Sequence, residues 1–132
     1  MNIALLAHDN KKKLMENLCL AYRSCLSKHV LFATGTTGLL VERNVGLSVS
    51  KHLAGHLGGE RQIGAQIAHN QIDLVIFLRD PNNPKYYEQE TNSVLELCDV
   101  RNIPIATNLA TAEALLQALD RGDLDWRYFV SE

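Results

Sequence analysis

The sequence predicts an α/β domain in which one parallel sheet of about five strands lies between two layers of helices. Short apolar runs alternate with amphipathic helical patterns along the whole chain. Strands separated by helices are joined by right-handed crossovers, and such strands are parallel. Polar residues follow the expected strands, which places them together at the edge of the sheet where ligands bind. The length of 132 residues, without a repeat or a low-complexity linker, fits a single domain over residues 1–132.

Each expected strand is a short apolar run that ends in polar or turn-forming residues. The run DLVIFL over residues 73–78 is the strongest, because it is continuously apolar after its first residue and precedes the turn-forming segment 79–85. The segment 46–53 is weaker and rests on the alternation of Leu47 and Val49. The five expected strands cover residues 2–7, 29–33, 46–53, 73–78 and 104–107.

The expected helices begin after residues that can cap them. Asp9 or Asn10 can cap the first helix, and Asn108 can cap the last. Glu60 adds a carboxylate to the first turn of the third helix, and Gly122 ends the last one. The five expected helices cover residues 10–26, 39–43, 60–70, 88–101 and 109–119.

The composition excludes several classes of protein. The formal net charge is −2 and the only basic run is residues 11–13, so we expect neither a nucleic acid nor a membrane surface as a partner. No apolar stretch approaches the ~20 residues of a membrane span, and the first residues lack the features of a signal peptide. Cys19, Cys25 and Cys98 are an odd number without metal-like spacing, which indicates buried, reduced thiols and a cytoplasmic location.

The segment 32–38 (FATGTTG) is the strongest candidate for a ligand site. A strand that turns sharply into a helix points free backbone N–H groups beyond the strand end, where the helix dipole favours an anion. Thr34, Thr36 and Thr37 add hydroxyl donors, and Gly35 lets an oxyanion approach the backbone. The pattern matches neither the Walker loop nor the dinucleotide G-x-G-x-x-G spacing. We interpret it as a phosphate cradle; a turn that is merely rich in small residues is the alternative.

Other polar residues follow the remaining strands. His8 comes directly after the first strand, and Lys12 lies one helical turn beyond it, where its amine can reach an anion. Glu60 follows two glycines and is a candidate general base; an ordinary first-turn carboxylate is the alternative. Asp80 follows the strongest strand and is either a site residue or the start of a turn.

Five stretches of the chain match the sequence pattern of a known protein family. They are Ala7-His8-Asp9 with Lys12, residues 33–38 (ATGTTG), Gly55 with Gly58-Gly59, residues 77–81 (FLRDP) and residues 102–112 (NIPIATNLATA). In this order and spacing they resemble the methylglyoxal synthase family, from residue 1 to about residue 127. The resemblance implies a five-stranded parallel α/β domain, usually a homohexamer. It implies a lyase that converts dihydroxyacetone phosphate to methylglyoxal and inorganic phosphate without a metal or an organic cofactor.

The resemblance also implies roles for individual residues. His8 matches a residue that lines the reacting end of the substrate. The positions that match the phosphate-binding residues of the family are Lys12, Thr34, Gly35, Thr36, Thr37 and Gly55. These are the same residues that the strand-end argument selects, apart from Gly55.

The chain departs from the family pattern where the chemistry is expected. Glu60 stands where the family has its catalytic aspartate, and Tyr87 aligns with the histidine that polarises the substrate. Glu90 aligns with an aspartate that supports this histidine, and Ala54 replaces a serine beside the phosphate site. We expect a synthase whose activity is retained but weakened or retuned. The alternatives are a regulatory or sensing module that binds phosphate or triose phosphate, and a different reaction on a related small phosphate.

Overall fold

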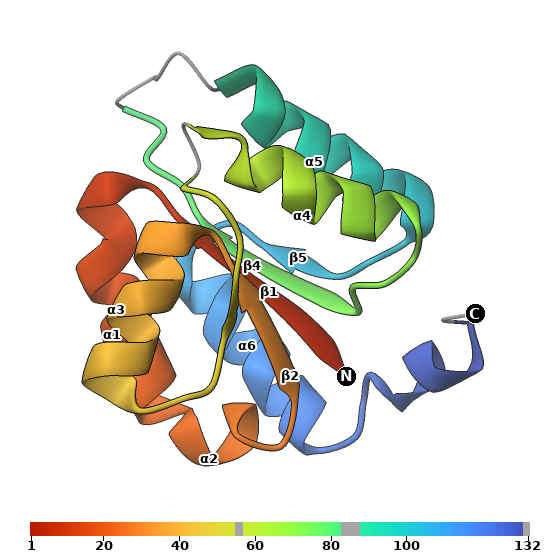
Figure 1. Ribbon diagram of the computed structural model, residues 1–132. Helices are drawn as coiled ribbons and strands as arrows, with labels where there is room; N and C mark the ends of the chain where they lie inside the picture. Colours follow the sequence, from red (N-terminus) through yellow and green to blue (C-terminus); the bar gives the residue numbers. More distant parts are fainter. Residues whose placement is uncertain (55–56, 83–87, 131–132) are drawn as a thin grey trace.

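The computed structural model describes residues 1–54, 57–82 and 88–130, which form one parallel sheet with helices on both faces (Figure 1). In these residues the sheet has five strands in the order β3-β2-β1-β4-β5, and every neighbouring pair is parallel. The strands are β1 (Asn2–Ala7), β2 (Val30–Ala33), β3 (Ser50–Lys51), β4 (Leu74–Leu78) and β5 (Ile105–Ala106). The predicted α/β fold with a five-stranded parallel sheet is therefore confirmed.

The helices divide into two layers, one on each face of the sheet (Figure 1). One layer contains α1 (Lys12–Ala21), α2 (Arg23–Leu26), α3 (Gly35–Val45) and α6 (Leu109–Asp120). The other contains α4 (Gly59–Ala68) and α5 (Glu88–Arg101). Two short 3₁₀ helices, η1 (Asp9–Lys11) and η3 (Asp125–Phe129), precede α1 and follow α6.

The hydrophobic core consists of two clusters that the central strands separate. Successive side chains of a strand point to opposite faces of a sheet. Ile3 and Leu5 of β1 therefore pack in the cluster beneath α1, α3 and α6, whereas Ala4 and Leu6 pack in the cluster beneath α4 and α5. Every residue of β4 is buried, as expected for a central strand that is covered on both faces.

The predicted helix over residues 10–26 is interrupted in the structure. A 3₁₀ turn occupies its first residues, and the backbone leaves the helical region at Tyr22 (φ −110°, ψ 25°) before α2 begins. This break turns Cys25 and Leu26 toward the core. The pattern of apolar residues continues across the break, which is why the sequence alone suggested one helix.

The predicted strand over residues 46–53 is present as β3 but is much shorter than expected. Only Ser50 and Lys51 pair with β2. Gly46 ends α3 in the left-handed conformation (φ 78°), which a glycine adopts readily. Leu47 and Val49 are buried in the core of the first layer without pairing as a strand. Their alternation reflects the packing of an extended connection and not a longer β3.

Two expectations from composition agree with the described residues. Cys19, Cys25 and Cys98 are free and buried. Burial raises the pKa of Cys19 and of Cys98 to about 12, so both thiols stay protonated at neutral pH. Within residues 1–54, 57–82 and 88–130, each helix is too short or too polar to cross a bilayer.

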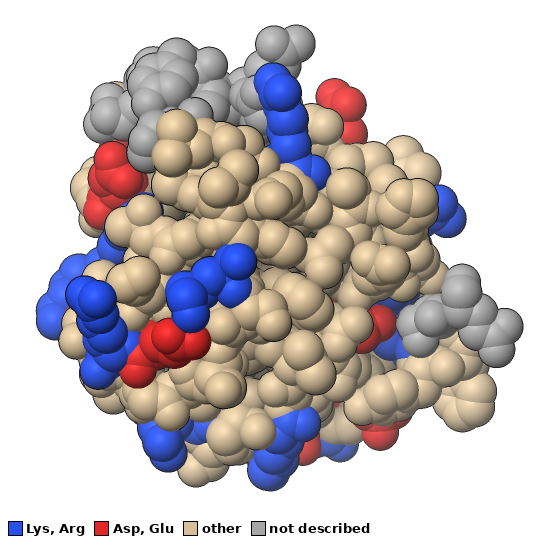
Figure 2. Space-filling model, viewed as in Figure 1, with Lys and Arg blue, Asp and Glu red and all other residues tan. Residues whose placement is uncertain are grey.

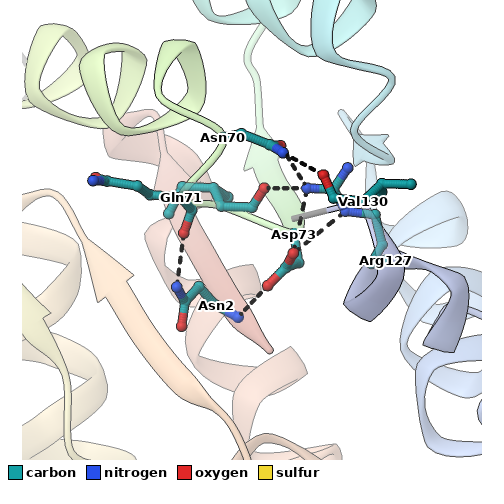
Figure 3. Close-up of polar contacts among 7 residues, drawn as sticks. Asn2, Asn70, Gln71, Asp73, Arg127 and Val130 are labelled. Atoms are coloured by element: carbon teal, nitrogen blue, oxygen red, sulfur yellow. Dashed lines mark hydrogen bonds and ion pairs between the residues drawn. The ribbon is translucent and has the colours of Figure 1, made fainter. Parts of the chain in front are cut away.

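The sequence analysis did not predict η3, which places a buried arginine at the amino-terminal end of the sheet (Figure 3). The guanidinium of Arg127 donates to Asp73 (3.3 Å), to Asn70 Oδ1 (2.9 Å) and to the carbonyl oxygen of Ile72 (3.1 Å). Asp73 also accepts from the backbone N–H of Asn2 (2.8 Å). These bonds tie the C-terminal segment to the starts of β1 and β4.

We predict that Asp73→Asn lowers the free energy of unfolding by about 3 kcal/mol, because it leaves the guanidinium of Arg127, 1% exposed, without its carboxylate partner. Chemical denaturation measures the change. Asp123→Asn is the matched control, since its ion pair with Arg121 is exposed and should contribute less than about 0.5 kcal/mol. Equal effects of the two substitutions would contradict a structural role for the buried pair.

Candidate active site

The predicted site residues converge at the carboxyl-terminal edge of the sheet. The strand order changes direction between β1 and β4, and ligands of doubly wound sheets bind at such a switch point. Ala7 pairs with Leu78, which places His8 level with the residue after β4. Leu5 of β1 pairs with Ala33, the last residue of β2, so the turn that follows β2 lies beside the end of β1.

The turn from β2 into α3 has the geometry of an anion cradle. Thr34 is extended (φ −63°, ψ 152°) and forms the N-cap of α3, but its side chain does not cap the helix. Its hydroxyl donates instead to Thr37 Oγ1 (3.5 Å), and both side chains are buried, whereas Thr36 is exposed. The N–H of Gly35 donates to the carbonyl oxygen of Leu53 (3.0 Å), whereas the next two amides of the first helical turn, those of Thr36 and Thr37, have no carbonyl partner within the helix and can donate to an oxyanion.

Two glycines bring the chain close to this turn. A Cβ on Gly35 would lie 2.8 Å from the carbonyl oxygen of His52, so only glycine fits there. A Cβ on Gly59 would collide with the carbonyl oxygen of Leu53 and would lie 2.9 Å from Thr34 Cγ2. The missing side chain of Gly59 therefore allows α4 to start directly against the end of β2.

Glu60 lies in the first turn of α4, next to this contact. Its carboxylate is 3% exposed and sits at the positive end of the helix dipole. The hydroxyl of Thr91, in α5, donates to both carboxylate oxygens (3.2 and 3.4 Å). Glu60 also lines a cavity between α4 and α5. A buried carboxylate at the start of a helix is a candidate general base.

His8 is held as a neutral imidazole between β1 and β4. The backbone N–H of Asp80 donates to its Nδ1 (2.9 Å), so the proton of the neutral ring is on Nε2. Burial lowers the pKa of His8, and the nearby charge of Arg79 lowers it further. The ring packs edge-on against Phe77, with 5.3 Å between centroids. His8 can thus supply an uncharged N–H donor at the strand ends.

Asp80 acts on His8 through its backbone, while its carboxylate organises the surrounding loop. Oδ1 accepts from the backbone N–H of Asn82 (3.1 Å), and Oδ2 accepts from the side-chain amide of Asn10 (2.8 Å). The first bond is the turn-starting interaction that the sequence offered as one alternative. The second joins the loop after β4 to η1.

The amine of Lys12 folds back onto the end of β1. Its Nζ donates to the carbonyl oxygen of Ala7 (2.9 Å) and lies 3.3 Å from Asp9 Oδ1. The side chain is 17% exposed, in contrast to 79% for Lys13. The structure therefore places Lys12 at the predicted edge and leaves Lys13 in solvent.

Sequence reasoning missed three residues that support this edge. Gln62 Oε1 accepts from the backbone N–H of Leu53 (2.7 Å), and Gln66 Oε1 lies 2.8 Å from His52 Nε2. The two glutamines are four residues apart and so share one face of α4. That spacing was a usable signal for the glutamines, whereas nothing in the local sequence marks Thr91 as a partner of Glu60.

The charge distribution agrees with a small ligand. Figure 2 shows blue and red side chains mixed over the face that it draws, without a continuous basic strip among the described residues. A cavity of about 440 Å³ beside the cradle is lined by Gly35, Thr36, His52 and Ala54. A larger one, about 780 Å³, lies between α4 and α5. We place the site at the strand ends, because the polar groups converge there.

Comparison with known proteins identifies the family. The MGS-like domain family matches residues 16–107. Methylglyoxal synthase of Caldicellulosiruptor saccharolyticus is 60% identical over 99% of this chain and 93% of its own length. This chain belongs to the methylglyoxal synthase family. The enzyme of Alkaliphilus metalliredigens is 54% identical over the full chain and 98% of its own length.

A solved structure of the family shares this fold. The crystal structure of methylglyoxal synthase from Elizabethkingia anophelis NUHP1 matches with a TM-score of 0.82 and 42% identity, over 87% of this chain and 76% of that one. The family positions expected at Gly55 and Tyr87 lie outside the described residues. Glu90 lies in α5, and its side chain is not described. Ala54 borders the cradle, and its carbonyl accepts from the backbone N–H of Gly59 (3.0 Å).

We predict that the stability of the protein decreases as the pH falls below about 6.5, partly because of His8. The pKa of His8 is lowered in the folded state, so the unfolded chain binds more protons below the ordinary value of 6.5. His8→Gln, which can still accept from Asp80 but does not titrate, should flatten this decrease between pH 7 and 5. Thermal unfolding at several pH values measures it.

The control for this experiment is His69→Gln, because His69 is exposed at the end of α4. Burial also lowers the pKa of His29, which contributes a dependence of the same sign in every variant. The same slope in His8→Gln and in the wild type would show that His8 is not held neutral.

Proposed function

We propose that this protein is a methylglyoxal synthase, a carbon–oxygen lyase that converts dihydroxyacetone phosphate to methylglyoxal and inorganic phosphate through an enediolate. The observation that carries the proposal is the contact at Gly59, which brings the first turn of α4, where the buried Glu60 lies, against the threonine turn at the end of β2. The relatives named methylglyoxal synthase, 52–60% identical over nearly the whole chain, support the same activity.

The phosphate group of the substrate binds at the start of α3. The proposed donors are the amides of Thr36 and Thr37, the hydroxyls of Thr34, Thr36 and Thr37, and the amine of Lys12. Lys12 leaves its bond with the Ala7 carbonyl or extends from it toward the anion. These interactions with the phosphate contribute to catalysis as well as to binding, because negative charge develops on the bridging oxygen as the phosphate leaves.

Glu60 is the proposed general base. It removes a proton from the hydroxymethyl carbon beside the carbonyl, and the electron pair of that C–H bond forms the C=C bond of the enediolate. His8, neutral with its proton on Nε2, is the proposed donor that stabilises the developing oxyanion. An uncharged donor is suitable here because it polarises the carbonyl without transferring a full charge.

Elimination follows from the enediolate. The hydroxyl on the former hydroxymethyl carbon loses its proton and forms the aldehyde C=O, and the C=C bond of the enediolate shifts to the methylene carbon. The bond between the methylene carbon and the bridging oxygen breaks at the same time, and inorganic phosphate leaves with that electron pair. The resulting enol takes up a proton at its methylene carbon and becomes methylglyoxal. The series of reaction steps is redox-neutral and conserves all atoms of the substrate. It requires only proton transfers and a stabilised phosphate leaving group.

The two substitutions at the reacting end predict a weaker or retuned enzyme. Glutamate is a competent base, but its extra methylene displaces the carboxylate, and a misplacement of ~1 Å can cost ~10²-fold in rate. Tyr87, with an ordinary pKa near 10, is a different acid from the histidine that the family pattern has at that position.

We predict that the purified protein releases phosphate and methylglyoxal in equal amounts from dihydroxyacetone phosphate. Glu60→Gln should lower kcat by roughly 10²–10⁴-fold, because an amide cannot accept the proton. Glu60→Asp combined with Tyr87→His should raise the rate. Glu16→Gln is the control, since Glu16 is also a buried carboxylate but pairs with Lys13 away from the strand ends (2.6 Å). A rate no higher than the buffer blank, at high protein concentration, excludes the synthase.

The same preparation tests the alternative of a binding module. If the protein is a binding module, phosphate or triose phosphate should raise the melting temperature without turnover. That result would exclude the synthase and support the binding module. Lys12→Ala or Thr36→Val should remove this stabilisation, whereas Lys11→Ala should retain it. Unchanged phosphate binding in Lys12→Ala would contradict the assignment of the cradle itself.

We also propose that the protein is a cytoplasmic homo-oligomer, and specifically a hexamer as the family resemblance implies. The three buried thiols fit a reducing compartment. Around η3 the chain exposes large apolar side chains that an interface would cover. They are Trp126 (40%), Tyr128 (58%), Phe129 (85%) and Val130 (50%).

We predict a molecular mass in solution of about six times the 14.7 kDa of the chain. Light scattering after size-exclusion chromatography measures it. Phe129→Ser should shift the mass toward smaller species, because it removes the most exposed apolar side chain of this surface. Val100→Ser is the control, a similarly exposed apolar residue on α5. A monomeric wild type would exclude the oligomer.

A further inference from the structure

A buried threonine of α5 holds the carboxylate of Glu60. Thr91 is the fourth residue of α5 and is 0% exposed. Its Oγ1 lies 3.2 Å from Oε1 and 3.4 Å from Oε2 of Glu60. An ionised carboxylate can only accept, so the hydroxyl is the donor and is shared between the two oxygens. Because both groups are buried, bulk water competes little with this bond.

Neither packing nor helix formation explains the hydroxyl of Thr91. Valine has nearly the same shape and would occupy the position without desolvating a polar group. Threonine offers no advantage over valine within a helix, since both are β-branched. Among the described residues, the contact that the hydroxyl makes is with the carboxylate of Glu60.

Among the described residues, charged side chains near Glu60 come from the two helices that flank it. Arg61 of α4 and Glu96 of α5 line the cavity of about 780 Å³ to which Glu60 also contributes. Thr91→Val leaves both of these charges in the protein, and Thr91→Ser keeps the hydroxyl, so comparing the two variants isolates the effect of the hydroxyl on the titration of Glu60.

We infer that Thr91 is a positioning residue that orients the carboxylate of Glu60 for proton abstraction. The inference rests on the proposed function of Glu60 as the base. A glutamate has one more rotatable bond than an aspartate, so its carboxylate can occupy more positions. The shared hydrogen bond restricts that freedom and favours the ionised form, which is the form that accepts a proton. Thr91 thereby compensates for the longer base that this chain carries.

We predict that Thr91→Val lowers kcat for dihydroxyacetone phosphate by about 10-fold, because the carboxylate is less well oriented. KM should change by less than about 2-fold, since the phosphate is held elsewhere. The acidic limb of the kcat/KM profile should move to higher pH, because the ionised carboxylate loses a donor. Thr91→Ser, which keeps the hydroxyl, should restore most of the rate and the wild-type pH profile. Thr111→Val, at an exposed threonine of α6, is the matched control.

A double-mutant cycle separates positioning from packing. In the Glu60→Asp background the shorter side chain no longer reaches the hydroxyl, so adding Thr91→Val should change kcat by less than about 2-fold. A structural role would lower kcat equally in both backgrounds. Equal losses, or wild-type rates and pH profiles in both Thr91→Val and Thr91→Ser, would overturn the inference.

The inference and the proposed function fail in different ways. Without turnover in the wild type, the proposed function is excluded, and so is positioning for catalysis. The contact itself is tested by carbon NMR of the ¹³C-labelled protein, with the signal of Glu60 assigned through its loss in Glu60→Gln. Thr91→Val should move the titration of this signal to higher pH. An unmoved titration overturns the inference even if the wild type is a synthase.

Discussion

The start of α4 lies directly against the end of β2, and the geometry of the strand-end edge depends on this contact. It exists because Gly59 has no side chain to meet Leu53 and Thr34. The contact brings two helix N-termini together, that of α3 with its threonines and that of α4 with Glu60. One positive dipole end can bind an anion, and the other can stabilise a buried carboxylate. A single close approach thus brings the proposed anion site and the helix that carries the proposed base together.

The carboxyl-terminal edge of the sheet combines cationic side chains with a neutral imidazole. Lys12 lies at the end of β1, and Lys51 lines the cavity beside the cradle. The charge of Arg79 acts on His8. At the reacting end His8 is kept neutral, through burial and through the N–H of Asp80 that occupies its Nδ1. A neutral ring can donate its Nε2–H without adding a formal charge at this edge.

Glu60, the proposed base, has a structural partner. The hydroxyl of Thr91 donates to both oxygens of its carboxylate. The pair joins α4 to α5 at the end where these helices begin. This hydrogen bond restrains the carboxylate of the proposed base, which gives a physical reason to expect retained activity.

The sequence by itself determined the fold class, most of the helices and strands, and the edge where the site lies. These follow from local patterns: the period of apolar residues, the turn chemistry after each strand, and polar residues at strand ends. Only the tertiary structure decided that residues 46–53 form little of a strand, and that the first helix breaks at Tyr22. It alone revealed the partners of Arg127, His8 and Glu60, which are 54, 72 and 31 residues away in the chain. Such contacts between residues far apart in the sequence depend on how the helix layers pack against the sheet, and no local sequence pattern predicts them.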